Sequence, residues 1–183
     1  NALTAERLQY LNRLPERMTL FNNGSPFRIG PFTIEPFSVS HDAVDPVAYV
    51  IRIGDLKISV VTDLGHAGKM VPLKARDSHL LILESNHDPE MLLRSDRPPK
   101  LQHRILSRRG HLSNQDCVAL LPDILGPNTR HLILAHLSDE CNDPRLARRL
   151  AATGLERLKR TDITLNVAEQ DRISPRFELD LRG

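Results

Sequence analysis

Residues 56–65 read Leu-Lys-Ile-Ser-Val-Val-Thr-Asp-Leu-Gly, and the pattern around this stretch decides the fold. Its first six residues are mostly apolar and rich in β-branched side chains, which predicts a strand. Asp63 and Gly65 are turn residues, so the strand should end just before them. Because strands present polar groups at their ends, Asp63 is the first candidate for a functional site. Both residues are also common in turns that have no function, and this plainer interpretation stays open.

Two other segments that predict strands also end in a histidine. His41 follows the alternating run at residues 37–40, and His136 follows the apolar run at residues 131–135. Neutral imidazoles and a carboxylate that can bridge two ions are common ligands of transition metals. The three strand ends therefore predict a metal site at one edge of a sheet, with His41, Asp63 and His136 as its ligands.

The composition predicts one soluble domain over residues 1–183, since 40% of the residues are hydrophobic and 26% are charged. No apolar run approaches the roughly 18 residues that span a membrane. The first residues lack the pattern of a signal peptide, so a cytoplasmic protein with no membrane partner is expected. Cys117 and Cys141 are too few for a disulfide framework and should be reduced. The net charge of +2 does not indicate a nucleic-acid binder, although a local basic patch remains possible.

The chain changes character near its middle. Turn residues and alternating apolar residues in the first third predict a β-meander, and strands that alternate with helices after residue 68 predict α/β layers. The predicted helices are a first one capped by Thr4 and stopped by Pro15, then 69–77, 89–94 after the Asp88 cap, 100–107, one from the Ser113 cap to about Leu125, and one begun by Asp143-Pro144 to about Ala152. The predicted strands are short ones within 18–40, then 47–53, 56–61, 80–84, 131–135, 163–167 and 177–181.

Three further segments carry a family resemblance. They are Glu-Ser-Asn-His-Asp at residues 84–88, Gly-His-Leu-Ser-Asn at residues 110–114, and His-Leu-Ser-Asp-Glu-Cys-Asn at residues 136–142. With the Thr-Asp-Leu-Gly turn, they resemble the metallo-β-lactamase superfamily and, within it, the branch of ribonuclease Z and the YycJ/WalJ-like exonucleases. The resemblance implies an αββα sandwich and two divalent metal ions, zinc or manganese. It assigns His41, Asp63 and His136 as ligands and Asp63 as the bridge between the ions.

The chain departs from this family in one respect. The superfamily's His-x-His-x-Asp-His motif, which supplies most ligands of the first metal, occurs nowhere in the 183 residues. These residues therefore resemble the C-terminal portion of the fold. Two explanations stay open: a piece of a longer protein, or a degenerate member that has lost its metal chemistry. The ligands present here would not by themselves make a normal two-metal site.

The resemblance also implies a catalytic histidine outside the metal ligands. His111 lies in a turn just before a helix, where free N–H groups and the helix dipole attract phosphate oxygens. The family resemblance makes it a group that stabilises the transition state or protonates the leaving oxygen. A polar turn residue that bonds the helix start is the alternative.

Four residues near this turn are candidates for substrate contact. His87 follows a predicted buried strand and could reach the same sheet edge, although capping is an equal alternative. Arg108 and Arg109 end a basic run that begins at Arg94, and such runs contact phosphates when they lie beside an active site, although they are more often solvated helix faces. Ser113 is either a helix cap or a substrate contact.

These observations predict a metal-dependent phosphodiesterase that acts on nucleic acid, most simply a DNA exonuclease. DNA is favoured over RNA as the partner, and a homodimer is possible. A thioester or lactone hydrolase on the same fold is the first alternative. A metal-free binding protein that keeps the fold is the second.

Overall fold

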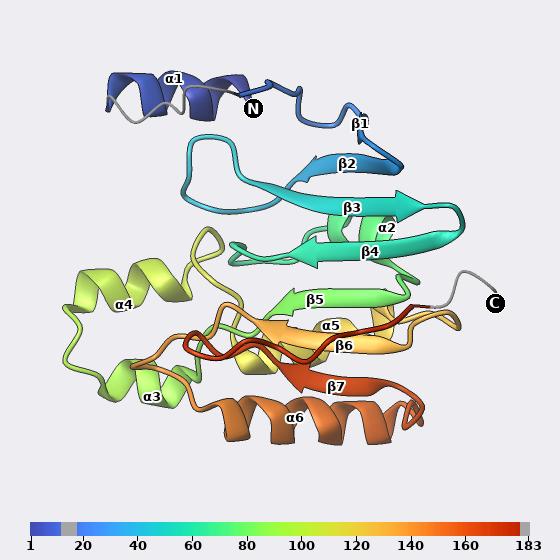
Figure 1. The fold of residues 1–183 in the computed structure, drawn as a ribbon. Coiled ribbons are helices and arrows are strands. Elements are labelled where there is room, and N and C mark those ends of the chain that lie inside the picture. The colour runs from blue at the N-terminus through green and yellow to red at the C-terminus, as the bar shows by residue number, and fades with distance from the viewer. Residues whose placement is uncertain (12–17, 180–183) are drawn as a thin grey trace.

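The structure is a computed structural model that describes residues 1–11 and 18–179. Its helices are α1 (Ala2–Tyr10), α2 (Met70–Ala75), α3 (Pro89–Arg94), α4 (Pro99–Leu106), α5 (Asn114–Ile124) and α6 (Pro144–Arg157). Its strands are β1 (Phe27–Ile29), β2 (Phe32–Ser38), β3 (Val47–Ile53), β4 (Leu56–Val61), β5 (Leu80–Glu84), β6 (His131–Ala135) and β7 (Thr164–Val167). They form a mixed α/β structure in which helices cover one face of a sheet (Figure 1).

The described strands form one seven-stranded sheet in the order of the chain, from β1 to β7. Strands β1 to β4 are antiparallel, and β4 to β7 are parallel. The predicted meander is confirmed, and Gly54 makes its last tight turn with a φ of 55°. Because β4, β5 and β6 run in the same direction, their carboxyl ends lie at the same edge of the sheet. This edge carries the candidate site.

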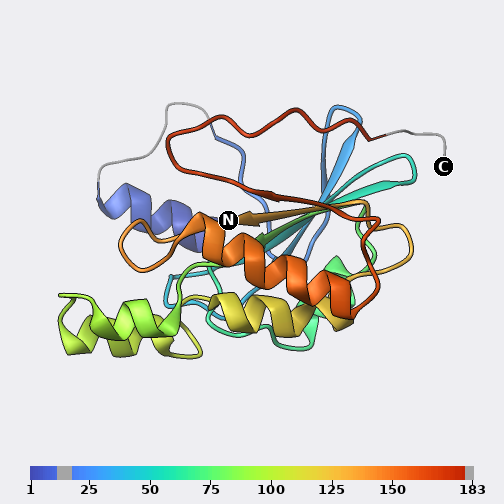
Figure 2. The same cartoon turned by 90° about the horizontal axis from the view of Figure 1, so that it is seen from below.

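Alternation along the strands sets the core. Val50, Val61, Leu83 and Leu134 are all fully buried on the face that the helices cover. Helices α5 and α6 pack on this face and against each other, as the view from below shows (Figure 2). At roughly 25 cal/mol per Å² of apolar surface removed from water, this face supplies the main driving force for folding.

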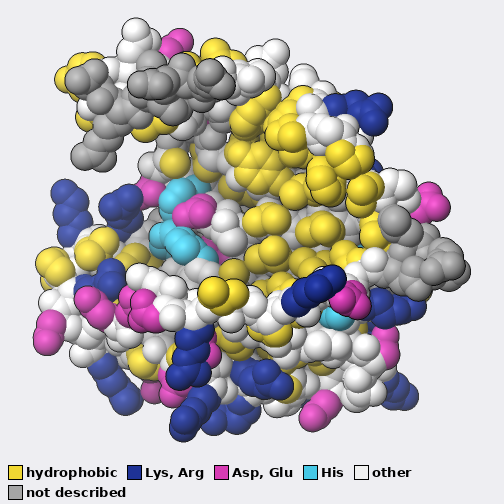
Figure 3. Space-filling view, viewed as in Figure 1, with side chains coloured by type: hydrophobic (Ala, Val, Ile, Leu, Met, Phe, Trp, Pro, Cys, Tyr) yellow, Lys and Arg dark blue, Asp and Glu magenta, His cyan; other side chains and the backbone are white. Residues whose placement is uncertain are grey.

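The opposite face of the sheet is only partly covered. A row of apolar side chains runs across four strands through the register pairs of Tyr49 with Val60, Val60 with Ile82, and Ile82 with Ile133, and all but Ile133 are half-buried. Apolar side chains gather over the sheet on this side, next to the cyan patch of histidines (Figure 3). The segment after β7 runs back along this side, and the Phe177 ring packs edge-on against His131 with centroids 5.5 Å apart.

Side-chain caps start three of the helices as predicted. The carboxylate of Asp88 accepts the N–H groups of Glu90 and Met91 at the start of α3. Ser113 caps α5, and Asp143 caps α6. Each cap satisfies N–H groups that have no partner within the helix, so the short motifs fix where these helices begin.

Some predicted elements differ from the structure. The first helix is capped by Asn1, not Thr4, because the Asn1 side chain accepts the Thr4 N–H, and this helix buries no side chain. Pro15, the predicted stop, lies outside the described residues. Helix α6 continues to Arg157 instead of ending near Ala152, since its buried positions recur as far as Leu155. Residues 177–179, the described part of the predicted last strand, form no strand.

Two simpler expectations can be compared directly with the structure. Cys117 and Cys141 are buried free thiols, as predicted. In the part of the chain that the structure describes, every helix is too short or too polar to cross a membrane.

Candidate metal centre

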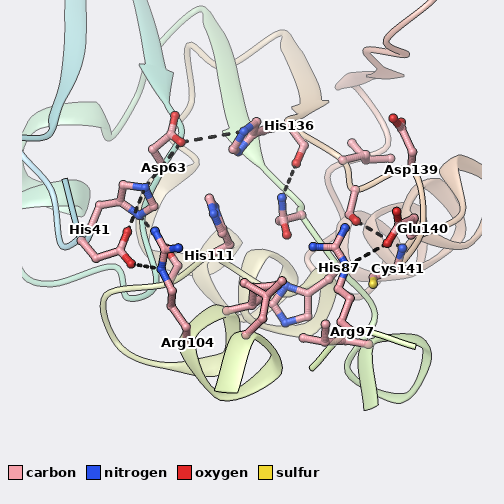
Figure 4. A pocket seen from close by; sticks show the side chains of 18 of the residues that line it. His41, Asp63, His87, Arg97, Arg104, His111, His136, Asp139, Glu140 and Cys141 are labelled. Atoms are coloured by element: carbon pink, nitrogen blue, oxygen red, sulfur yellow. Dashed lines mark hydrogen bonds and ion pairs between the residues drawn. The ribbon is translucent and has the colours of Figure 1, made fainter. Parts of the chain in front are cut away.

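Four segments meet at the carboxyl edge of the sheet. Asp63 follows β4, His136 follows β6, and His41 follows β2 after a single bridge that pairs Ser40 with His66. The fourth side chain is His111, from the loop between α4 and α5. In Figure 4 these four labelled side chains converge at one end of the cavity.

Distances among these side chains suit a shared cation. One oxygen of Asp63, Oδ1, lies 3.8 Å from Nε2 of His41 and 3.8 Å from Nε2 of His136. Asp63, His111 and His136 each offer a ligand atom within 4.8 Å of the other two. Ligand atoms about 2.0–2.2 Å from a tetrahedral ion lie roughly 3.4 Å apart, so the 3.8 Å contacts of Asp63 would shorten by about 0.4 Å around an ion, and the widest pair by up to about 1.4 Å.

The other nitrogen of each ring is held by a hydrogen bond within the protein. His41 Nδ1 lies 2.8 Å from the carbonyl oxygen of Gly110. The Nδ1 atoms of His111 and His136 lie 2.7 and 2.9 Å from Oε1 of Glu84. Acceptors at these positions make Nδ1 the protonated nitrogen, and Nε2 is then free to bind a cation. This arrangement is typical of histidines that ligate metals.

Glu84 is the functional residue that sequence reasoning missed. It is the last residue of β5 and is fully buried, yet it carries a carboxylate. Its Oε1 accepts from both histidines, and its Oε2 accepts the N–H of Leu64 at 2.9 Å. Buried carboxylates are rare unless they are paired. The available signal was an acid directly after the apolar run at residues 80–83, at the edge where the other candidates end.

The charges of this group are coupled. Burial acts to raise the pKa of Glu84, but the hydrogen bonds from His111, His136 and the Leu64 N–H outweigh it and hold the pKa below its usual value. The hydrogen bond to Glu84 raises the pKa of His136. A carboxylate that stays ionised inside the protein therefore supplies negative charge directly behind two of the candidate ligands.

Two glycines allow the His111 loop to press against the Asp63 turn. A Cβ at Gly65 would lie 2.3 Å from the carbonyl oxygen of Ser107 and 2.4 Å from the nitrogen of Gly110. A Cβ at Gly110 would lie 2.1 Å from the carbonyl oxygen of Ile105. Since no larger residue fits at either position, the two glycines set how closely His111 approaches Asp63.

Two candidate ligands sit in strained backbone. Asp63 has a φ of 58° and His136 has a φ of 59°, both in the left-handed region. This region costs a residue other than glycine about 1–3 kcal/mol, and Asp77 and Lys159 adopt it elsewhere in the chain. The strain turns both side chains toward the same point at the sheet edge.

The four residues predicted to contact substrate lie at different places relative to the cavity. His87 lines the same cavity, on the side away from Asp63 (Figure 4). Arg108 and Arg109 are exposed at the loop that carries His111, and Arg109 Nε donates to the His41 carbonyl at 3.3 Å. Ser113 is not brought to the cavity, because it is buried and its hydroxyl both donates to the Asp116 carboxylate and accepts the Asp116 N–H.

The donor set fits a divalent transition metal. Three imidazoles and one carboxylate are borderline ligands of the kind that zinc and manganese accept. Each ring already has the second hydrogen bond that fixes its orientation, which is the usual outer shell of a metal site. His41, Asp63, His111 and His136 are therefore the residues that would hold an ion here.

The sequence is similar to those of known proteins. The chain is 34% identical over 137 residues to the exodeoxyribonuclease YycJ of Bacillus anthracis, covering 75% of this chain and 52% of the relative. It is 32% identical over 163 residues to the exodeoxyribonuclease WalJ of Streptococcus pneumoniae, covering 88% of this chain and 60% of the relative. The chain thus spans between half and two thirds of these relatives. No family model matches the sequence.

Solved structures with the same fold have lower identity. The metallo-β-lactamase fold protein YhfI from Bacillus subtilis matches with a TM-score of 0.64 and 19% identity, covering 90% of this chain and 60% of that one. Zinc-bound PqqB from Methylobacterium extorquens matches with a TM-score of 0.50 and 15% identity, covering 81% of this chain and 52% of that one. CmlA, a diiron β-hydroxylase from Streptomyces venezuelae, matches with a TM-score of 0.55 and 11% identity, covering 90% of this chain and 35% of that one.

These structures show that the chain has the metallo-β-lactamase fold. Among proteins with this fold, its relatives in sequence are the YycJ and WalJ exodeoxyribonucleases. The resemblance drawn from the segments at residues 84–88, 110–114 and 136–142 is thereby confirmed.

Proposed function

We propose that this chain forms part of a metal-dependent nuclease that hydrolyses phosphodiester bonds in DNA. One observation carries the proposal: Asp63 and three histidines converge with their Nε2 atoms free, because Glu84 and the Gly110 carbonyl hold the Nδ1 atoms. The names of the sequence relatives support DNA as the substrate.

Asp63, His41 and His136 hold metal in this proposal. A divalent ion in such a site polarises the phosphoryl oxygen, activates water at neutral pH and orients the substrate. These three side chains leave one position of a tetrahedral ion open, and a second ion would need further ligands. The number of ions per chain is therefore a direct measure of whether further ligands take part.

His111 acts as the proton donor for the leaving oxygen. Its ring stands between those of His41 and His136, with ring centroids 4.9 and 5.1 Å away. The buried Glu84 carboxylate orients the ring through Nδ1, so Nε2 is the nitrogen available to the leaving oxygen. His111 also belongs to the set of groups that could bind an ion, so its role must be tested by metal content as well as by turnover.

Basic side chains at the mouth of the cavity support a polyanionic substrate. Arg97 and Arg104 line the cavity, and Arg108 and Arg109 are exposed beside it. Arg97 and Arg104 pair with Glu140 and Asp42, so the support for a polyanion rests on Arg108 and Arg109. Cations that contact phosphates release counterions on binding, so affinity should fall steeply as salt rises.

The test combines metal content with hydrolysis. Purified protein is dialysed against metal-free buffer, loaded with Zn²⁺ or Mn²⁺, analysed for metal per chain, and then incubated with end-labelled DNA duplexes. We expect bound metal and metal-dependent release of nucleotides, and we expect Asp63→Ala to lose both. Asp55→Ala, in the turn between β3 and β4, is the matched control and should retain both.

Two results would contradict the proposal. The first is DNA hydrolysis at the same rate by the Asp63→Ala variant, which would show that the activity comes from elsewhere. The second is metal binding without cleavage of any phosphodiester but with cleavage of a thioester or lactone, which would favour the alternative hydrolase.

A further inference from the structure

The cavity extends from the metal centre to a second wall formed by α3 and α4. Its volume is about 500 Å³, within the range of sites that bind small molecules. Leu92 of α3 and Leu101 and Ile105 of α4 supply apolar side chains to this wall. This wall thus offers apolar surface to the cavity, which charged side chains such as Arg97 and Glu140 also line.

His87 lies on this side of the cavity beside Arg97 and Glu140 (Figure 4). Arg97 and Glu140 pair with each other, whereas no contact explains His87. It is 1% exposed, and neither Nδ1 nor Nε2 has a hydrogen-bond partner among the described residues. A buried polar atom without a partner costs about 1–3 kcal/mol. A buried polar group without a partner calls for an explanation, and a ligand that forms hydrogen bonds to the ring is one such explanation.

The state of His87 defines what it can bind. Burial lowers its pKa, and the nearby His111 lowers it further, so the ring is neutral at pH 7. A neutral imidazole offers one donor and one acceptor. It is therefore suited to a neutral partner that also presents a donor and an acceptor, and poorly suited to an unpaired phosphate.

Ion pairs on opposite sides of the cavity tie the α3–α4 wall to the rest of the molecule. Arg104 of α4 pairs with Asp42, next to His41, and Arg97 Nε lies 3.0 Å from the Glu140 carboxylate, beyond β6. Figure 4 shows both pairs at the border of the cavity. The wall is thereby held in place, and the cavity ends at it.

We infer that this cavity receives the base of the nucleotide next to the cleaved bond, with His87 forming a hydrogen bond to the edge of the base. A base is planar and apolar on its faces, which suits Leu92, Leu101 and Ile105, and its edge carries the donors and acceptors that His87 lacks. This inference rests on the proposed nuclease function and deepens it.

The test compares a nucleotide with the same molecule without its base. Binding of thymidine 5′-monophosphate and of 2-deoxyribose 5-phosphate to zinc-loaded protein is measured by titration calorimetry. We expect the nucleotide to bind at least about tenfold more tightly, which corresponds to about 1.4 kcal/mol. His87→Leu should remove most of this preference and leave the affinity for 2-deoxyribose 5-phosphate unchanged. His103→Leu, at an exposed histidine of α4, is the matched control and should keep the preference.

Thermal unfolding gives an independent readout of the same side chain. Leucine has a similar volume and no unpaired polar atom, so His87→Leu should melt at the same temperature as the parent or higher. A clear loss of stability would mean that the ring has a structural partner, and it would overturn the inference. Equal affinity for the two ligands in the parent protein, or no binding of either, would overturn it as well.

The outcomes also separate this inference from the proposed function. Nucleotide binding that depends on His87 in a protein that cleaves no DNA would remove the nuclease function and leave the base pocket. DNA cleavage by a protein that binds both ligands equally well would do the reverse.

Discussion

Replacing Glu84 by glutamine tests the hydrogen-bond network that holds the metal ligands. The side chain keeps its shape but loses its charge and gains an NH₂ group. In one orientation, the oxygen still accepts from His111 and His136, and the NH₂ group faces the N–H of Leu64. In the other, the NH₂ group faces both Nδ1 atoms. Either way at least one donor faces a donor, at a residue that is fully buried.

The expected magnitude follows from these contacts. A buried donor without an acceptor costs about 1–3 kcal/mol, so the melting temperature of the metal-free variant should fall. Where the NH₂ group faces the imidazoles, their protons must move to Nε2, the nitrogen that binds metal. Loss of such an outer hydrogen bond typically weakens metal affinity about 10- to 100-fold, or by about 1.4–2.7 kcal/mol.

The assay is competition for Zn²⁺ between the protein and a fluorescent chelator, with a thermal melt of each metal-free variant. Glu35→Gln is the matched control, because Glu35 of β2 pairs with Lys74 of α2 and, among the described residues, forms no hydrogen bond or ion pair with the candidate ligands. It should leave the zinc affinity unchanged. If Glu84→Gln stays folded and holds zinc as tightly as the parent protein, the carboxylate does not orient the ligands and the reasoning is refuted.

Four further outcomes are expected. His111→Ala should lower turnover about 10²-fold or more, as expected for a lost proton donor. The metal content of this variant should equal that of the parent protein, and a loss of metal would instead make His111 a ligand. Reversing Arg108 and Arg109 to Glu should weaken DNA binding and flatten its dependence on salt in a filter-binding titration, and an unchanged slope would return these residues to ordinary surface. Gly65→Ala should lower the free energy of unfolding by about 1–3 kcal/mol in a urea titration, because the added Cβ forces the backbone of Ser107 and Gly110 to move. Gly68→Ala is the control and should be close to neutral, because a Cβ there meets nothing within 4 Å. Burial raises the pKa of Cys117 to about 12, so its thiol is protonated at pH 8 and should resist iodoacetamide until the protein is unfolded; rapid labelling of the native protein, read by mass spectrometry, would contradict this burial.

The sequence predicted most of the elements because their signals are local. The caps Asp88, Ser113 and Asp143 and the apolar run of β5 each act within a few residues, and each was found where expected. The first helix was placed less well, because Asn1 and Thr4 are both good caps and only the bonded geometry chooses between them. Local signals also do not tell whether a short helix finds a surface to cover, and α1 buries no side chain.

The sequence by itself determined which residue types end the strands, and with them Asp63, His41 and His136 as candidates. Only the tertiary structure decided how these side chains are held. The bonds that do so join residues 27, 52 and 69 positions apart, from His111 and His136 to Glu84 and from His41 to Gly110. Packing also decided that Ser113 serves its helix and that His87 is left without a partner. Periodicity and caps are properties of neighbouring residues, whereas a hydrogen-bond partner across the sheet edge exists only once the strands, the loops and their glycines have come together.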